Sequence, residues 1–230
     1  MIHHETTTGR LNFLDELAHL CHERGVNLLI DSVSSFGAEN IVFDEPSVIA
    51  GAAAANKCLH GAPGLAFVMA RRSAFIEMNN APRRSLYLDL GNYLSHQDQR
   101  STPFTPPVHL LYALHQALLE YKQSGGLQAR HHTYLNLSLQ IRRGLLTLGI
   151  KPFLPRAEDS SIVLAAYHLP ENISYKSFHD QLKQNGFIIY AGQGEFADRI
   201  FRVSTMGELT EDDLKRFLEN IKVILRTQSV

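Results

Sequence analysis

Apolar positions in the first part of the chain alternate between helical and strand-like patterns. Over residues 11–24 they recur at helical spacing. Residues 26–30 form a short, nearly continuous apolar run that ends at Asp31, which is typical of a buried strand. Residues 47–55 are small and apolar, and residues 64–70 predict a second strand. A helix, a strand, a loop and a strand in succession favour an α/β layer around a mostly buried sheet.

The pattern changes after residue 100. Helical spacing over residues 108–121 follows a Pro-Pro pair, and a longer helical pattern covers residues 127–148. The remainder predicts a small α+β unit, with strands at 161–168, 187–190 and 200–204 and helices at 175–185 and 211–225, the last capped by Thr210. We therefore expect three parts: part of a large α/β domain at 1–126, a connecting helix at 127–148 and a small C-terminal domain at 149–230.

Composition narrows the classes of protein. The 230 residues are 44% hydrophobic and 20% charged, which excludes a disordered chain. A net charge of -1 provides no basic field, so we expect neither nucleic acid nor a membrane as a partner. No apolar run reaches the roughly 18 residues of a membrane span, and the start lacks the pattern of a signal peptide. Two cysteines suit a reducing compartment, so we expect a cytoplasmic protein.

Two charged residues stand where chemistry is plausible. Asp31 ends a predicted strand, where open α/β sheets place their ligand crevice, although an aspartate at this position is more often a turn or cap residue. Lys57 lies among small residues, and a lysine that is partly shielded from water becomes nucleophilic near neutral pH, although a lone loop lysine is usually structural. Pyridoxal phosphate enzymes need such a pair, a lysine for the cofactor aldehyde and a carboxylate for the ring nitrogen.

Other candidates are weaker. The pairs His3-His4 and His131-His132 lack the spacing of a zinc site. Cys58 is expected to be a small buried residue rather than a nucleophile. The Arg71-Arg72 pair is expected to be a solvated helix start.

Five segments carry a family resemblance, and they match in order and spacing over nearly the whole chain: residues 4–9 (His-Glu-Thr-Thr-Thr-Gly), 31–38, 55–64, 84–90 and 104–107 (Phe-Thr-Pro-Pro). They resemble those of the 2-aminoethylphosphonate–pyruvate aminotransferases, which are class V, fold-type I pyridoxal phosphate enzymes. The resemblance implies an α/β fold that corresponds to the C-terminal two-thirds of a fold-type I transferase: part of the large α/β domain and the small α+β domain.

The resemblance also implies roles around the cofactor. Lys57 would be the Schiff-base lysine and the base that moves the substrate proton, and Asp31 would pair with the pyridinium nitrogen. Thr6 would lie near the phenolic oxygen of the ring, and its alternative is a turn threonine before the first helix. Asn56 could reach the phosphate or the ring face.

Two further residues would act at the edges of the site. Thr105 would bind the cofactor phosphate of the neighbouring subunit in a homodimer, and its alternative is the N-cap of the helix that follows it. Arg202, on a predicted strand, would grip the substrate carboxylate with its planar fork, whereas most strand arginines are solvated or in structural ion pairs.

The implied reaction moves the amino group of 2-aminoethylphosphonate to pyruvate and gives phosphonoacetaldehyde and L-alanine. The alternatives are a related class V aminotransferase of the alanine/serine–glyoxylate/pyruvate type and a catalytically incomplete remnant or split-protein half. The family carries its phosphate-binding turn and ring-stacking residue ahead of the segment that begins this chain. We therefore expect an N-terminally truncated chain with an uncovered apolar face and little activity alone.

Overall fold

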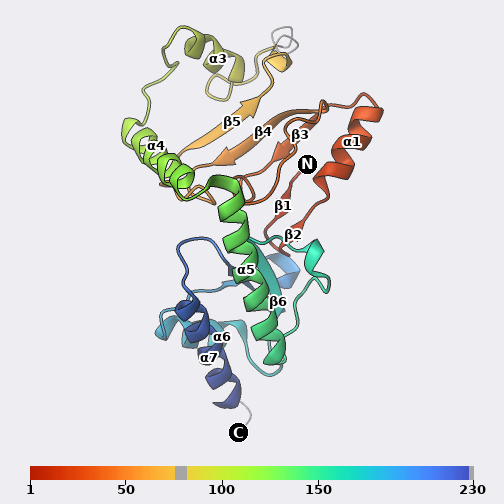
Figure 1. Ribbon diagram of the computed structural model, residues 1–230, viewed down its shortest axis with the longest axis vertical. Coiled ribbons are helices and arrows are strands. Elements are labelled where there is room, and N and C mark those ends of the chain that lie inside the picture. The colour runs from red at the N-terminus through yellow and green to blue at the C-terminus, as the bar shows by residue number, and fades with distance from the viewer. Residues whose placement is uncertain (76–81, 228–230) are drawn as a thin grey trace.

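The computed structural model describes residues 1–75 and 82–227. Two parts lie end to end and are joined by one long helix, α5 (Gly126–Thr147) (Figure 1). The N-terminal part is built on a three-stranded sheet in the order β3-β4-β5, and the C-terminal part on a three-stranded sheet in the order β6-β8-β7. This arrangement is a partial α/β layer followed by an α+β unit.

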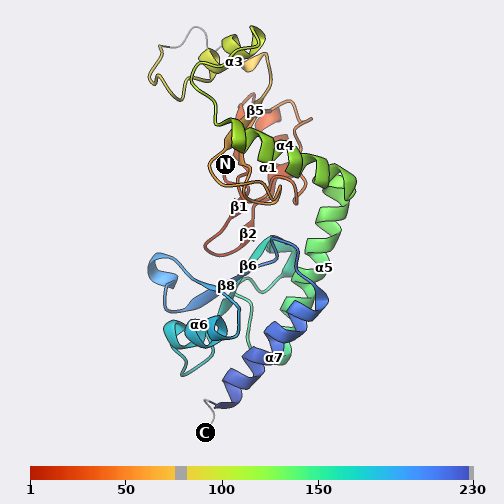
Figure 2. The same ribbon diagram turned by 90° about the vertical axis from the view of Figure 1, so that its left-hand side faces the viewer.

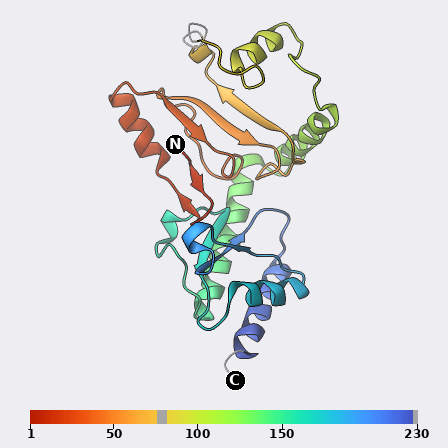
Figure 3. The same ribbon diagram turned by 180° about the vertical axis from the view of Figure 1, so that it is seen from behind.

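The first sheet is covered on one face by a helix. Its strands are β3 (Leu28–Asp31), β4 (Val48–Ala54) and β5 (Ala66–Ala70), with β3 and β4 parallel and β5 antiparallel to β4. The helix α1 (Leu14–Glu23) lies along this face (Figure 3). Their shared core contains apolar side chains of α1, β3 and β4: Leu14, Ala18, Leu28, Ile30 and Val48.

The other face of this sheet is open in the described part of the chain. Leu29 of β3 and Val68 of β5 are 59% and 42% exposed. The expectation of a mostly buried sheet is therefore wrong for this chain. Residues of a strand point alternately to opposite faces, so the apolar run at 26–30 supplies both the face under α1 and the open face.

A short hairpin connects the two parts. Its strands are β1 (His4–Glu5) and β2 (Arg10–Leu11), which the hydrophobic pattern did not predict. The chain before β1 extends the sheet beside β3, because Ile2 pairs in parallel with Asp31. The first helix accordingly begins at Leu14, three residues later than the apolar spacing predicted.

Three helices follow the sheet within residues 82–147. They are α3 (Leu90–Asp98), α4 (Val108–Gln123) and α5, of which α3 was not predicted. Pro107 is the N-cap residue of α4 and no side chain caps this helix. The alternative interpretation of Thr105 as an N-cap is therefore wrong, because the helix starts beyond the two prolines.

The C-terminal part has a closed core. Its strands are β6 (Leu164–His168), β7 (Tyr190–Ala191) and β8 (Ile200–Ser204), and its helices are α6 (Tyr175–Gln184) and α7 (Glu211–Thr227). Figure 2 shows α5 and α7 side by side. Between the helices and the sheet lies a cluster of buried apolar side chains that includes Leu145, Tyr167, Phe178, Leu182, Phe201 and Ile221.

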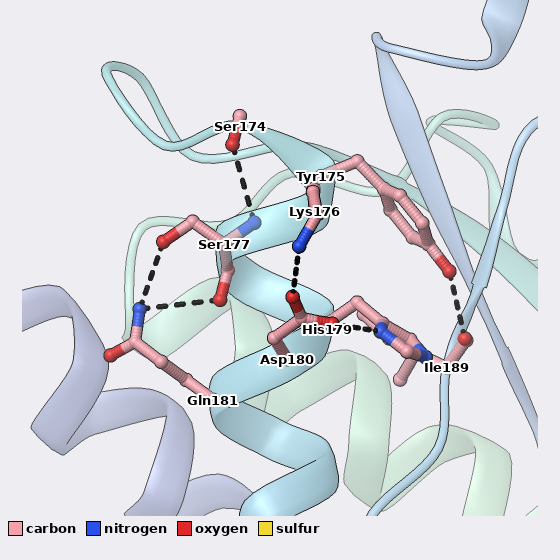
Figure 4. A network of polar contacts seen from close by, with 8 residues as sticks. All are labelled: Ser174, Tyr175, Lys176, Ser177, His179, Asp180, Gln181 and Ile189. Carbon is pink, nitrogen blue, oxygen red and sulfur yellow. Dashed lines mark hydrogen bonds and ion pairs between the residues drawn. The ribbon is translucent and has the colours of Figure 1, made fainter.

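Caps and side-chain hydrogen bonds fix the helices of this part. Ser174 accepts the backbone N–H of Ser177 at 3.2 Å, and the Tyr175 hydroxyl donates to the carbonyl of Ile189 at 2.9 Å (Figure 4). The predicted cap of α7 is confirmed, because the Thr210 hydroxyl accepts the N–H of Asp213 at 3.1 Å. The predicted strand at 187–190 is shorter, since only Tyr190 and Ala191 pair with β8.

Two kinds of feature are absent from the described residues. None of their helices is long and apolar enough to cross a membrane. They also contain no group of three or more His, Cys, Asp or Glu side chains that could hold a metal ion.

Candidate active site

A pocket of about 270 Å³ opens at the carboxyl end of β3, beside the turn of the β1–β2 hairpin. Open α/β sheets bind ligands at this edge of the strands. Most of the residues that line the pocket are of polar types; they are Ile2, His4, Glu5, Thr6, Thr7, Asp31, Val33, Ser34 and Gln193. Two residues predicted from the sequence, Thr6 and Asp31, are thus brought into one cavity.

Two backbone hydrogen bonds hold Asp31 to the segment that precedes β1. Its N–H donates to the carbonyl of Met1 at 2.8 Å, and its carbonyl accepts the N–H of His3 at 2.9 Å. The carboxylate oxygen Oδ1 accepts the N–H of Val33 at 3.1 Å, and the side chain is exposed. The strand therefore presents a carboxylate whose position is fixed and whose second oxygen is free to accept a donor from a bound group.

The turn that carries Thr6 is organised by the carboxylate of Glu5. This group accepts the N–H groups of Thr7 at 2.6 Å and Thr8 at 3.0 Å, and also the Thr8 hydroxyl. Burial alone raises the pKa of Glu5, but these hydrogen bonds outweigh it and hold the pKa below the usual value. Thr6 is therefore a turn residue, as its alternative interpretation held, and it also lines the pocket.

Lys57 lies on a tight turn directly after β4. The N–H of His60 donates to the carbonyl of Lys57 at 2.9 Å, and the N–H of Gly61 donates to that of Ala55 at 2.8 Å. A side chain at position 61 would approach the Ala55 carbonyl oxygen to 2.9 Å, so the turn needs glycine there. Lys57 is half-buried in this turn, whereas Asn56 is exposed.

His4, which lines the pocket, has a lowered pKa. His4 is buried there, and its Nδ1 lies 3.0 Å from the carbonyl oxygen of Ser34. Burial lowers the pKa of His4 most, and the Lys57 cation lowers it further. His4 is therefore neutral at pH 7.

Arg202 of β8, in the C-terminal part, binds the turn that carries Thr6. Its Nη1 donates to the carbonyl of Thr6 at 2.9 Å and its Nε to that of Ala191 at 2.7 Å. Neither alternative expected from sequence, a solvated arginine or an ion pair, describes these two bonds to carbonyl groups. The guanidinium is thereby fixed beside the pocket.

Gln193 is a site residue that the sequence did not indicate. Its Oε1 accepts the Thr7 hydroxyl at 2.9 Å, and it lines the pocket. A glutamine between two glycines has the composition of an ordinary loop, so its sequence context carried no functional signal.

Three other predicted residues are placed as follows. Thr105 is exposed in the loop before α4, and no described contact joins it to the pocket. Cys58 is buried as predicted, and burial raises the pKa of its thiol to about 12, so it holds no thiolate at neutral pH. Arg71 is not the solvated residue that was expected, because its guanidinium donates to four carbonyls: those of Phe43, Asp44, Glu45 and Val48.

The polar side chains at this site match the groups on one side of a pyridoxal ring. A carboxylate at the end of a strand and threonines of the adjacent turn line the pocket, an arginine fork binds the backbone of that turn, and a half-buried lysine lies on the turn after β4. These are the groups that a protonated ring nitrogen, a phenolic oxygen, an aldehyde and a carboxylate substrate require.

Comparisons with known proteins agree with this fold. A ureidoglycine–glyoxylate aminotransferase from Bacillus subtilis superposes with a TM-score of 0.90 over 100% of this chain and 60% of its own, at 24% identity. An aspartate aminotransferase from Thermus thermophilus superposes with a TM-score of 0.86 over 99% of this chain and 64% of its own, at 26% identity. The fold is part of the fold-type I aminotransferase fold.

The family model of the class V aminotransferases matches residues 1–217, and the chain belongs to this family. A 2-aminoethylphosphonate–pyruvate transaminase of Pseudomonas putida (strain W619) is 36% identical over an alignment that covers 100% of this chain and 62% of the relative. One from Aeromonas hydrophila subsp. hydrophila is 39% identical over 91% of this chain and 56% of the relative. The chain therefore spans about three-fifths of the length of these relatives.

Proposed function

We propose that this chain belongs to an aminotransferase that moves the amino group of 2-aminoethylphosphonate to pyruvate with pyridoxal phosphate as cofactor. The products are phosphonoacetaldehyde and L-alanine. The observation that carries the proposal is that Asp31 and Thr6 line one pocket and that Arg202 binds the carbonyl of Thr6, in a chain that presents Lys57 on the turn after β4 and whose relatives are named for this reaction.

Each residue takes a defined task. When bound, pyridoxal phosphate supplies an aldehyde for the amine and a ring that withdraws electrons from the substrate carbon. Lys57 holds the aldehyde between turnovers and, once displaced by the substrate amine, takes the proton from the substrate carbon. Asp31 keeps the ring nitrogen protonated, and Thr6 donates its hydroxyl to the phenolic oxygen.

Arg202 and two exposed residues complete the proposal. The fixed guanidinium of Arg202 binds the carboxylate of pyruvate and the phosphonate of the other substrate, since both groups accept a pair of N–H donors. Asn56 contacts the phosphate or the ring face. Thr105 contacts the cofactor phosphate of a second subunit, so we propose a homodimer. The two free cysteines suit the reducing cytoplasm as its location.

The runner-up is a class V aminotransferase that uses alanine or serine with glyoxylate. The solved structures favour it in one respect, because the Bacillus subtilis protein that resembles this fold is named for glyoxylate. The curated relatives, at higher identity, are named for the phosphonate substrate, and we therefore rank that substrate first.

One experiment tests both the attachment site and the donor. The purified chain is mixed with pyridoxal phosphate, treated with borohydride, and mapped by peptide mass spectrometry, with Lys57→Arg as the matched control. We expect the label on Lys57 in the wild type and its loss in the variant. Label on another lysine with Lys57 unmodified overturns the proposal.

The donor is then identified by competition. Because a substrate amine displaces the lysine, 2-aminoethylphosphonate added before borohydride should lower the labelling of Lys57 more than equal concentrations of alanine or serine. If alanine or serine lowers it more, the runner-up is correct.

A further inference from the structure

A cluster of aromatic and basic side chains holds the turn of Lys57 against α5. Arg130 of α5 donates from Nη1 to the carbonyl of Cys58, the residue after Lys57, at 2.8 Å. Its guanidinium lies over the rings of Tyr121 and Tyr134, with centroid distances of 5.4 Å and 5.8 Å. The two tyrosines thus flank the arginine that binds the lysine turn.

The hydroxyl of Tyr134 is a junction between the two parts of the molecule. Its oxygen lies 2.6 Å from Nε2 of His60, a residue of the lysine turn. It also accepts the N–H of Gly207 at 3.3 Å, three residues beyond the end of β8. Since β8 carries Arg202, a single buried hydroxyl connects the lysine turn to the strand of the arginine.

The direction of these hydrogen bonds follows from the number of protons. The oxygen of the Tyr134 hydroxyl accepts the Gly207 amide, and we assign its one hydrogen to Nε2 of His60, which accepts in the tautomer that is protonated at Nδ1. This assignment requires a neutral imidazole. Burial lowers the pKa of His60, and the Arg130 cation lowers it further, while Glu208 and Glu120 oppose them. His60 is therefore neutral at pH 7 and accepts.

A backbone hydrogen bond links His60 to Lys57. The N–H of His60 donates to the Lys57 carbonyl, and the φ of His60, 62°, lies in the left-handed region, which is unfavourable for a side chain that is not glycine. Such a conformation persists where surrounding contacts fix it. The bond between the Tyr134 hydroxyl and the imidazole is such a contact, and it acts together with the backbone bonds of the turn.

We propose that Tyr134 and His60 are positioning residues that set the place of Lys57 from the strand that carries Arg202. The inference rests on the proposed roles of Lys57 and Arg202. The lysine turn and the arginine strand then move as one unit, so a displacement of β8 changes the position of the lysine. Tyr134 and His60 act through the turn and touch no reacting atom.

The chain offers a matched pair of variants. Tyr134→Phe removes the hydroxyl shared by His60 and Gly207, whereas Tyr121→Phe removes a hydroxyl that donates to the carbonyl of Gly37, a residue outside the turn, at 3.0 Å. Both keep a ring against Arg130. We expect Tyr134→Phe to raise amide hydrogen exchange at His60 and Gly61 about tenfold in the cofactor-free protein, and Tyr121→Phe to leave it within about twofold.

A pH profile separates positioning from general stability. In the wild type, exchange at these two amides, corrected for intrinsic rates, should increase as the pH falls through the titration of His60, since a protonated Nε2 cannot accept. The rate at which acetic anhydride modifies Lys57 should change over the same pH range. The pH dependence of amide exchange and that of Lys57 acetylation should both be absent in Tyr134→Phe and in His60→Gln. Amide exchange should stay slow in His60→Gln, because the glutamine amide oxygen accepts the Tyr134 hydroxyl.

The outcomes decide the proposal. If Tyr134→Phe matches Tyr121→Phe, or if His60→Gln retains the pH dependence, the connection is wrong even when borohydride labels Lys57. If the exchange and acetylation results hold but borohydride leaves Lys57 unlabelled, the connection stands and the proposed function fails. Should Tyr134→Phe not fold, the pH profile of His60→Gln alone decides.

Discussion

The two parts of this protein bury their apolar residues in opposite ways. In the C-terminal part, Phe178, Leu182, Phe201 and Ile221 are 0% exposed, in a core enclosed by helices and a sheet. In the N-terminal part the sheet is covered on one face, and Leu29 and Val68 on the other are 59% and 42% exposed. The closed part therefore has a larger apolar core than the one between α1 and its sheet in the open part.

The candidate site residues lie mainly in the open part. Asp31, Lys57 and Thr6 belong to the open part, on strand ends and turns that few apolar contacts hold. The closed part holds the turn of Thr6 through individual hydrogen bonds: Arg202 donates to the Thr6 carbonyl, and Gln193 accepts the Thr7 hydroxyl. A rigid core thus positions a site that lies outside it.

The largest expected difference between the two parts is in the cost of removing an apolar side chain. Phe201→Ala should lower the free energy of unfolding by about 3–5 kcal/mol, because it leaves a cavity between Tyr167 and Phe178. Val68→Ala on the open face should change it by no more than about 0.5 kcal/mol. Urea denaturation of both variants checks this, and equal costs would show that the open face is covered in solution.

The next largest effect is on the pH dependence of the free energy of unfolding, and it comes from a buried carboxylate at the junction of the two parts. Glu39 accepts the Ser161 hydroxyl at 2.6 Å and the Ile162 N–H at 2.9 Å, both on Oε1. Burial raises its pKa, although these bonds and the His131 charge oppose the shift. The folded state therefore favours the protonated form, and ionisation of Glu39 lowers stability as the pH rises from the ordinary glutamate range through the raised pKa.

Glu39→Gln tests this contribution, because its amide oxygen can accept both donors without a charge. Each unit between the folded and unfolded pKa is worth about 1.4 kcal/mol, so the variant should gain stability relative to the wild type as the pH rises from 4 to about 7. Parallel urea denaturation curves at several pH values measure the difference. A difference that is constant with pH, or that falls, contradicts the prediction.

The smallest expected effect comes from removing a helix N-cap in each part. Thr210 caps α7, which buries Leu214, Phe217, Ile221 and Ile224, whereas Asp89 caps α3, which buries no residue. Thr210→Ala should therefore cost about 1 kcal/mol of global stability. Asp89→Ala should cost less than about 0.5 kcal/mol, since α3 can fray without opening a core. Thermal denaturation with equal shifts for the two variants would contradict the contrast.

Local pattern predicted much of the C-terminal half. The strand at Ile200–Ser204 and the start of α6 at Tyr175 lie where the sequence placed them, because each apolar periodicity there is resolved within one element. The pattern failed at β1, β2 and β7. These strands have two residues each, which is too short for a period to be read.

The sequence by itself determined the family segments, the helices and strands with clear periodicity, and the choice of Asp31 and Lys57 as candidates. Tertiary structure alone decided that Arg202 binds the carbonyl of Thr6, 196 residues away, and that Gln193 binds Thr7, 186 residues away. It also decided which face of β3 is open and that Tyr134 meets His60. Periodicity reports how a residue is buried within its own element, whereas the partner of a polar side chain depends on how distant elements pack.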